Sequence, residues 1–196
     1  MTGLTGLTDY WQRLGLVGRT GEPGSPEAMV CRDDGIIPNS PLPVLIYRGD
    51  SGERAALEGL FAATAWPVQW AGGIFAFQHY HSTAHEVLGV TGGQAHVQLG
   101  GASGDVVTLS RGDIVIIPAG VAHCRLQADS DFEVVGGYPA NQPEWDLCRA
   151  DAALHATAKA RIARVPPPPA NPVTGADEPW AQSPTRHLSD PQRAPS

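Results

Sequence analysis

Three histidines and one glutamate fall within eight residues of this chain, in the stretch GIFAFQHYHSTAHEVLGVTGG at residues 73–93. A later stretch, GDIVIIPAGVAHCRLQ at residues 112–127, carries one more histidine after a Pro-x-Gly turn. Imidazole nitrogens and carboxylate oxygens both bind divalent first-row metals. Metal binding is therefore the chemistry that these residues could perform, if the fold brings the two stretches together.

The spacing of the residues favours such a meeting. His79 and His81 are two positions apart, so on a strand both side chains point to the same face. Glu86 follows a short turn, where it can fold back beside them, and His123 begins a strand at a sharp corner. We expect His79, His81, Glu86 and His123 to bind one divalent transition-metal ion, such as Fe, Mn, Ni, Co or Zn. Four ligands around a six-coordinate ion leave two positions open for a substrate or dioxygen.

Neighbouring residues have other expected roles. A single histidine on a strand is more often a hydrogen-bonded residue than a ligand, so the hypothesis depends on the whole set. His85 is adjacent to Glu86 and should therefore face the opposite side of the strand. The less favoured alternative is that His85 is itself a ligand or contacts one. Tyr80 should face away for the same reason. Phe75 and Phe77 alternate in phase with the H-x-H pair and are expected to form an apolar wall.

The elements around these residues look like a β-barrel. Residues 73–138 contain seven short β-like runs separated by turn signals such as TGGQ, GGASGD and SRGD. Closely spaced strands with glycine-rich turns predict an all-β fold, an antiparallel sandwich or barrel. The clearest helix is DSGERAALEGLFAATAW at residues 50–66, where Asp50 and Glu53 resemble a capping box.

The chain divides into four predicted parts. Residues 1–35 are expected to be a flexible N-terminal extension with at most one short helix, and residues 36–140 to form the barrel with its preceding helix. Residues 141–165 should be helical, and residues 166–196 a proline-rich tail laid over the barrel or over a neighbouring subunit. The stretch LPVLIYRG at residues 42–49 is a candidate edge strand through which a homodimer could form.

Composition limits the partners and the compartment. The chain has 196 residues, a formal net charge of −7 and a pI of about 5.4, with no basic block. Nucleic acid and anionic membrane surfaces are therefore not expected as partners. The N-terminus lacks the pattern of a signal peptide, and the three cysteines are scattered without a C-x-x-C pair, so we expect a cytoplasmic protein.

Both stretches resemble the two signature motifs of the cupin superfamily, whose fold is the double-stranded β-helix. The first motif, G-x5-H-x-H-x4-E-x6-G, is matched by Gly73, His79, His81, Glu86 and Gly93. The second, G-x5-P-x-G-x2-H-x3-N, is matched by Gly112, Pro118, Gly120 and His123, with Gln127 in place of the final Asn. The resemblance implies a single jelly-roll barrel with a few flanking helices, and it implies the same four metal ligands. The departure at Gln127 affects no ligand.

The likeness extends over residues 32–180 to small one-barrel bacterial cupins of the YjlB type, a group with no settled substrate. The resemblance therefore implies fold and metal site more than reaction, and it is the mixed His/Glu set, with coordination positions left open, that leads us to expect a metalloenzyme acting on a small polar molecule. Dioxygenase-like chemistry is the first expectation if the ion is Fe(II), and isomerase-like chemistry the second if it is Mn or Zn. The alternative is a non-catalytic cupin that binds or senses a metal or a small ligand.

Overall fold

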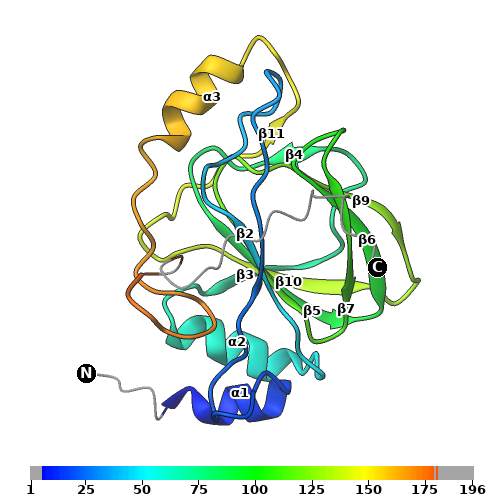
Figure 1. Cartoon of the computed structure of the whole chain (residues 1–196), viewed down its shortest axis with the longest axis vertical. Coiled ribbons are helices and arrows are strands. Elements are labelled where there is room, and N and C mark those ends of the chain that lie inside the picture. The colour runs from blue at the N-terminus through cyan, green and yellow to red at the C-terminus, as the bar shows by residue number, and fades with distance from the viewer. Residues whose placement is uncertain (1–5, 179, 181–196) are drawn as a thin grey trace, which may run out of the picture.

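Two antiparallel sheets form the body of the computed structural model, which describes residues 6–178 and 180 (Figure 1). The first sheet contains, in order, β1 (Glu27–Met29), β2 (Val44–Tyr47), β8 (Ile114–Ile117), β5 (Glu86–Gly92), β10 (Glu133–Gly137) and β3 (Val68–Gly72). The second contains β11 (Cys148–Arg149), β4 (His79–Tyr80), β9 (His123–Ala128), β6 (Gln94–Leu99) and β7 (Asp105–Ser110). The predicted all-β barrel with flanking helices is confirmed.

Within residues 6–178, three helices flank the sheets. Helices α1 (Thr8–Leu14) and α2 (Arg54–Ala63) lie together at one end of the molecule, and α3 (His155–Ile162) lies at the other end (Figure 1). None of the helices in the described part of the chain has the length and apolar character needed to cross a membrane.

The central strands β2 and β8 of the first sheet are buried on both faces, which explains why they are apolar without a polar alternation. In β8, Val115 and Ile117 belong to the core between the two sheets. Ile114 and Ile116 belong to a second core, which the sheet shares with α1 and α2. All four side chains are at most 3% exposed. Because both faces are covered, alternate residues of the run IVII pack into two different hydrophobic cores.

Helix α2 covers the outer face of this sheet through three fully buried side chains, Leu57, Leu60 and Phe61. The helix begins later than the sequence suggests, and the predicted capping box is wrong. Glu53 is the N-cap residue but makes no side-chain cap. Its carboxylate pairs instead with the guanidinium of Arg13 on α1, because the packing of the two helices brings that charge within reach.

The stretch predicted as an edge strand is an interior strand. Strand β2 lies between β1 and β8, and its four residues are buried. The prediction was wrong because the N-terminal segment contributes β1, which pairs with β2 over residues 27–29 and takes the edge position. A homodimer through β2 is therefore excluded in this fold, while the homodimer itself stays a prediction.

The described part of the proline-rich segment lies along the molecule from α3 to α2, as the orange trace of Figure 1 shows. Its backbone carbonyls accept hydrogen bonds from three side chains of the barrel's helical end. These bonds join Trp66 Nε1 to Ala170 O (2.8 Å), Thr64 Oγ1 to Pro172 O (3.1 Å) and Trp11 Nε1 to Val173 O (2.8 Å). Residues 1–5 of the predicted extension and residues 179 and 181–196 of the predicted tail lie outside the described residues.

The packing of α2 predicts a large cost for truncating its central leucine. Leu57 is fully buried, so Leu57→Ala should lower the free energy of unfolding by about 2–5 kcal/mol. The matched control is Leu126→Ala on β9, where the side chain is 53% exposed and the change should be about 0.5 kcal/mol or less. Urea unfolding of both variants measures the difference. Equal losses in the two would contradict the assignment of this core.

Candidate metal centre

Strand pairing brings the two histidine-bearing stretches together. Strands β4 and β9 are neighbours, and His79 lies opposite His123 in their register. His81 comes directly after β4. Glu86 opens β5, where it shares the inward face with Leu88 and Val90 of the core between the sheets.

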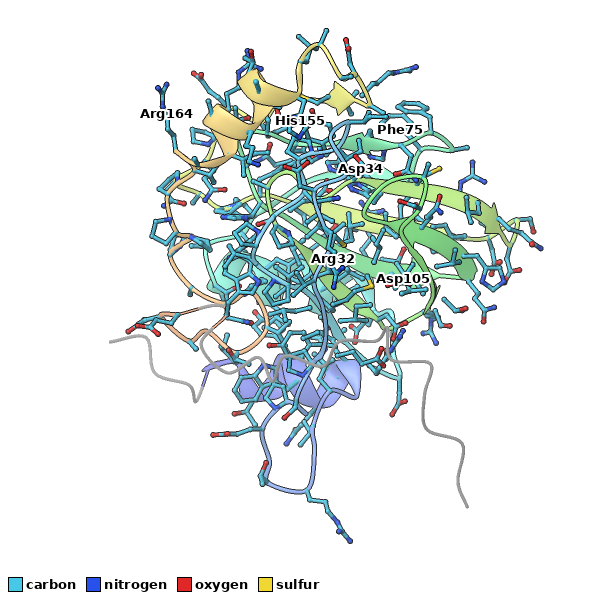
Figure 2. The ribbon with its side chains drawn as sticks, turned by 45° about the horizontal axis from the view of Figure 1, so that its top comes forward. Arg32, Asp34, Phe75, Asp105, His155 and Arg164 are labelled. Carbon is cyan, nitrogen blue, oxygen red and sulfur yellow. The ribbon has the colours of Figure 1, made fainter. Side chains whose placement is uncertain are left out.

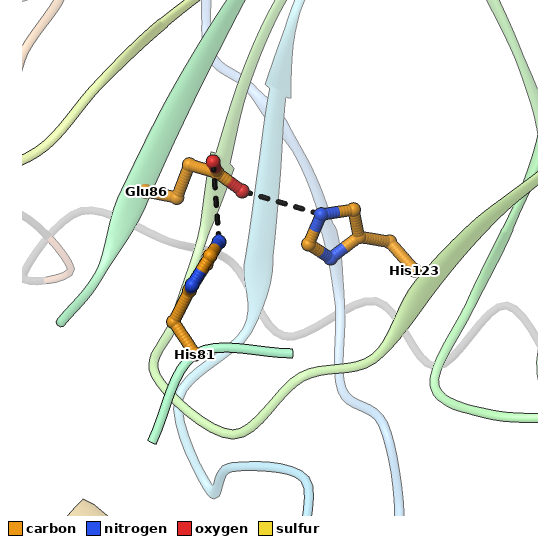
Figure 3. A group of neighbouring side chains, drawn as sticks. All are labelled: His81, Glu86 and His123. Carbon is orange, nitrogen blue, oxygen red and sulfur yellow. Dashed lines mark ion pairs between the residues drawn. The ribbon is translucent and has the colours of Figure 1, made fainter. Parts of the chain in front are cut away.

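Three of the four predicted ligands converge. One ligand atom from each of His81, Glu86 and His123 lies within 4.8 Å of the others, and Figure 3 shows the three side chains pointing toward one another. His81 Nε2 is 3.3 Å from Glu86 Oε1, and His123 Nε2 is 3.2 Å from Glu86 Oε2. All three side chains are at most 5% exposed. This buried group could hold a metal ion.

His79 lies beside this trio. Its ring centroid is 4.0 Å from that of His123, and both rings border the same cavity. The side chain is buried, but its nitrogens fall outside the group of mutually close ligand atoms. Its role as a fourth ligand therefore stays a prediction.

The three histidines share one orientation. In each, Nδ1 contacts a backbone carbonyl, which can only accept a hydrogen bond, so the imidazole proton belongs on Nδ1. The pairs are His79 with Phe77 (3.0 Å), His81 with Asp146, and His123 with Val121 (3.4 Å). In the neutral rings this leaves the Nε2 lone pair free, which is the arrangement that fixes histidines as metal ligands.

Glu86 provides the test of whether these residues fit a cation. Its Oε1 accepts a hydrogen bond of 2.8 Å from the Tyr138 hydroxyl. Its Oε2 is buried and, among the described residues, accepts no hydrogen bond of acceptable geometry, although His123 Nε2 is 3.2 Å away. A buried anionic oxygen without a partner is costly, and a divalent ion bound by the neighbouring Nε2 atoms would satisfy it. The residues present therefore fit a metal.

The charges of the trio depend on one another. Burial raises the pKa of Glu86, but the imidazoles of His81 and His123 outweigh it and hold the pKa well below its usual range. For His81, burial lowers the pKa, but the Glu86 carboxylate and the Asp146 carbonyl outweigh it and raise the pKa above its usual value. The Glu86 carboxylate is therefore charged at neutral pH and available to a cation.

Two further groups keep fixed protonation states at neutral pH. Burial, followed by repulsion from His123, lowers the pKa of His79 to about 3, so this ring is neutral and can act as a ligand. Burial and the adjacent Glu86 carboxylate raise the pKa of Tyr138 above its ordinary value, so its hydroxyl keeps its proton.

A cavity of about 350 Å³ adjoins the three histidines and is walled mainly by apolar side chains. Trp145 stacks on Tyr138 with ring centroids 4.7 Å apart and meets the ring of His81 edge-on at 5.7 Å. Phe75, labelled in Figure 2, also lines the cavity and is 49% exposed. Phe77, which was expected to share this wall, does not line the cavity. Its ring stacks on that of Phe75, and Cζ of Arg149 lies 3.9 Å from the centroid of the Phe77 ring.

Gly136 on β10 makes room for one wall of this cavity. A Cβ at this position would lie 2.1 Å from Cε2 of Trp70, whose ring lines the cavity. Trp70 Nε1 also donates a hydrogen bond of 3.2 Å to the Tyr138 hydroxyl. The glycine therefore lets the indole reach the tyrosine that contacts Glu86.

Asp146 is a site residue that the sequence motifs did not indicate. Its carbonyl accepts from His81 Nδ1, and its carboxylate accepts a 2.6 Å hydrogen bond from the Ser82 backbone N–H. Tyr138 and Trp145 were missed as well. All three follow the last motif in the chain, and the only signal was the aromatic residue in NQPEW, which has no fixed spacing from the histidines.

The residues expected to face away from the metal do so. His85 Nδ1 accepts a hydrogen bond of 2.9 Å from the Ala119 backbone N–H, and its ring packs against Trp180. Tyr80 is 1% exposed and packs in a separate cluster with Ile37 and Ala158. The strand alternation used to separate these residues from the ligands is therefore confirmed.

Comparison with known proteins agrees with this geometry. Residues 69–135 match the family model of the cupin domain. The chain is 35% identical over 148 residues to the uncharacterized protein YjlB of Bacillus subtilis, covering 75% of this chain and 89% of that protein.

The similar solved structures share less sequence identity with this chain. Procruciferin, an 11S globulin from Brassica napus, is 21% identical with a TM-score of 0.33, and the match covers 54% of this chain but only 23% of that chain. A DUF861 family protein from Thermotoga maritima is 20% identical with a TM-score of 0.33, covering 48% of this chain and 98% of that one.

The burial of His85 predicts a pH dependence of stability. Burial lowers the pKa of this histidine to about 4, whereas an unfolded histidine titrates near 6.5. As the pH falls below about 6.5, the unfolded state binds a proton that the folded state refuses, so stability is lost toward pH 4. His85→Phe should therefore reduce the slope of unfolding free energy against pH by up to about 1.4 kcal/mol per unit.

Urea unfolding at several pH values between 4.5 and 7, with chelator present, measures this slope. The control is Val87→Ala on the same strand, a fully buried site without a titrating group. That variant should lower stability at every pH without changing the slope. A His85→Phe slope equal to that of the wild type would contradict the prediction.

Proposed function

This chain is a cupin-domain protein of the same family as Bacillus subtilis YjlB, and we propose that it is a metal-dependent enzyme acting on a small molecule inside the barrel. His81, Glu86 and His123 would bind a divalent first-row transition ion, with His79 as the fourth ligand. The observation that carries the proposal is the buried, unpartnered Oε2 of Glu86 among Nε2 lone pairs.

The cavity supports an enzyme rather than a closed structural site. Structural metal sites are surrounded by protein ligands on all sides, whereas here a cavity of about 350 Å³ borders the three histidines. When bound, such an ion supplies a Lewis acid for substrate oxygens, or dioxygen chemistry if it is Fe(II). We favour dioxygenase-like activity first and isomerase-like activity second.

The side chains of the cavity define the rest of the proposal. Trp70, Trp145 and Phe75 offer an apolar, largely aromatic lining, which suits a substrate with an apolar body and oxygen donors at one end. Because its pKa is raised, Tyr138 keeps its proton and donates it to Glu86 Oε1, which leaves the hydroxyl oxygen to accept a hydrogen bond from a bound substrate. Asp146 acts as a positioning residue, since its carbonyl fixes the ring of His81.

The first prediction of this proposal concerns metal content. The wild type, incubated with Fe(II), Mn(II), Ni(II), Co(II) or Zn(II) and freed of excess ion, should retain one equivalent of at least one of them. His81→Ala and His123→Ala should retain none, because each removes a member of the buried trio. His79→Ala should weaken binding about tenfold or more if this ring is a ligand. Elemental analysis and calorimetry give stoichiometry and affinity.

The control for these variants is His85→Phe, which changes a buried histidine that faces away from the trio and should keep the metal. Equal stoichiometry in the wild type and in His81→Ala would overturn the metal site itself.

The second prediction separates catalysis from simple binding. Protein loaded with Fe(II) without oxygen should consume dioxygen when supplied with a member of a panel of aromatic diols, keto acids and thiols. Protein loaded with Mn or Zn should instead exchange a substrate C–H proton with deuterated water, detected by NMR, if it is an isomerase. Tyr138→Phe should lower kcat more than it raises KM, because it removes the hydroxyl that donates to Glu86 and keeps the ring. Metal-dependent binding of panel members without any turnover would favour the non-catalytic alternative.

A further inference from the structure

We propose that the protein has a second ligand site, which takes the carboxylate of an apolar small molecule in a cavity beneath α3. This cavity has a volume of about 680 Å³, within the range of small-molecule sites. Its walls are the loop at residues 38–42, the end of α3 with residues 163–167, and the side chains of His85 and Trp180.

The first observation is a donor of a buried side chain that reaches the cavity without a protein acceptor. His85 is 5% exposed, and its Nδ1 accepts a hydrogen bond from the Ala119 backbone N–H at 2.9 Å. Since a backbone N–H can only donate, Nδ1 carries no proton and the ring proton lies on Nε2. Within the described part of the chain, no group accepts a hydrogen bond from this Nε2–H. This Nε2 atom is not one of the fully buried unpaired atoms of the described residues, so it is accessible from the cavity that His85 lines, where a ligand would supply its acceptor.

A second donor lines the same cavity. Ser40 is 6% exposed, and its Oγ accepts a hydrogen bond of 3.2 Å from the Leu42 backbone N–H. Its own O–H has no acceptor among the described residues. Asn39, by contrast, is fully engaged, because its amide nitrogen donates to the carbonyls of Arg32 and Gly100 and its amide oxygen accepts from Ala122. Among the neutral side chains of the cavity, the free hydrogen-bonding capacity is therefore that of donors, which favours a ligand group that accepts.

The charge of the lining favours an anion. Of the side chains that line the cavity in the described part of the chain, Lys159 is the one that carries a full charge, and its carboxylate partner Asp33 does not line the cavity. The Lys159 ammonium contacts Asp33 at 2.7 Å and its side chain is 63% exposed. An ammonium at the rim and two neutral donors match a carboxylate, for which hydrogen bonds are stronger than for a neutral carbonyl.

The remaining lining is apolar and built of fixed groups. Trp180 packs against the His85 ring with centroids 4.9 Å apart, and its Nε1 donates to the carbonyl of Pro43 at 2.8 Å. Prolines of the 38–42 loop and Ile162 of α3 complete the walls. Such walls suit the hydrocarbon part of an aromatic or medium-chain acid.

This site is separate from the metal centre. His85 and Glu86 are adjacent on the chain, so their side chains leave it on opposite sides. The two cavities share no lining residue. The second site therefore adds to the proposed function and does not depend on it.

The test is calorimetric titration of the whole chain, as purified and after treatment with a chelator, with 4-phenylbutyrate and decanoate, and with their amides as neutral counterparts. We expect saturable binding of one equivalent of acid and at least tenfold weaker binding of the amide. Ser40→Ala should weaken acid binding about three- to tenfold. Ala163→Trp should abolish it, because this exposed position lines the cavity and a large side chain there fills it. Trp145→Ala, in the cavity of the metal centre, should leave it unchanged.

Each opposite result overturns the proposal. If neither acid binds saturably at millimolar concentration, the proposed site does not exist. If acid and amide bind with equal affinity, the site does not select a carboxylate. Binding that survives Ala163→Trp but is lost in Trp145→Ala would place the acids in the metal cavity. A dimer in sedimentation that dissociates in Ala163→Trp would show that a second copy of the chain covers this cavity. Circular dichroism of each variant verifies that the fold is intact.

Discussion

A single carboxylate buried in the middle of an apolar barrel is the constraint on which the rest of the structure depends. Removing Glu86 from water costs free energy that only fixed partners can return. The Tyr138 hydroxyl donates a hydrogen bond to Oε1 of Glu86, and the imidazoles of His81 and His123 lie close to the carboxylate. Among the described residues, Oε2 still accepts no hydrogen bond. The buried carboxylate is thus partly compensated by protein groups, and its unpaired Oε2 could still bind a cation.

The order of the site comes from backbone groups more than from other side chains. Three peptide carbonyls orient the three histidines: those of Phe77 and Val121, each two residues before its histidine, and that of Asp146 in the segment that follows β10. Because backbone carbonyls orient the rings before any ion binds, the conformational entropy of the histidine side chains is lost during folding and not during metal binding. The aromatic residues beyond them add a dry wall on one side, where a small molecule can approach.

The sequence predicted those features that depend on strand periodicity. Two-residue spacing put His79 and His81 on one face, and alternation separated His85 from Glu86. Local patterns failed where distant segments decide. Arg13 draws Glu53 into an ion pair in place of the predicted cap, and β1 covers the strand expected at the sheet edge. Tyr138, Trp145 and Asp146 reach the site through long-range packing, which residue spacing does not encode.

The segment from Trp145 to Arg149 connects two properties that most binding sites keep apart. Trp145 forms part of the cavity wall, the carbonyl of Asp146 sets the angle of the His81 imidazole, and Cys148 and Arg149 pair with β4 as β11. A change in the length or path of this segment would therefore move the cavity wall and the carbonyl that orients His81 together.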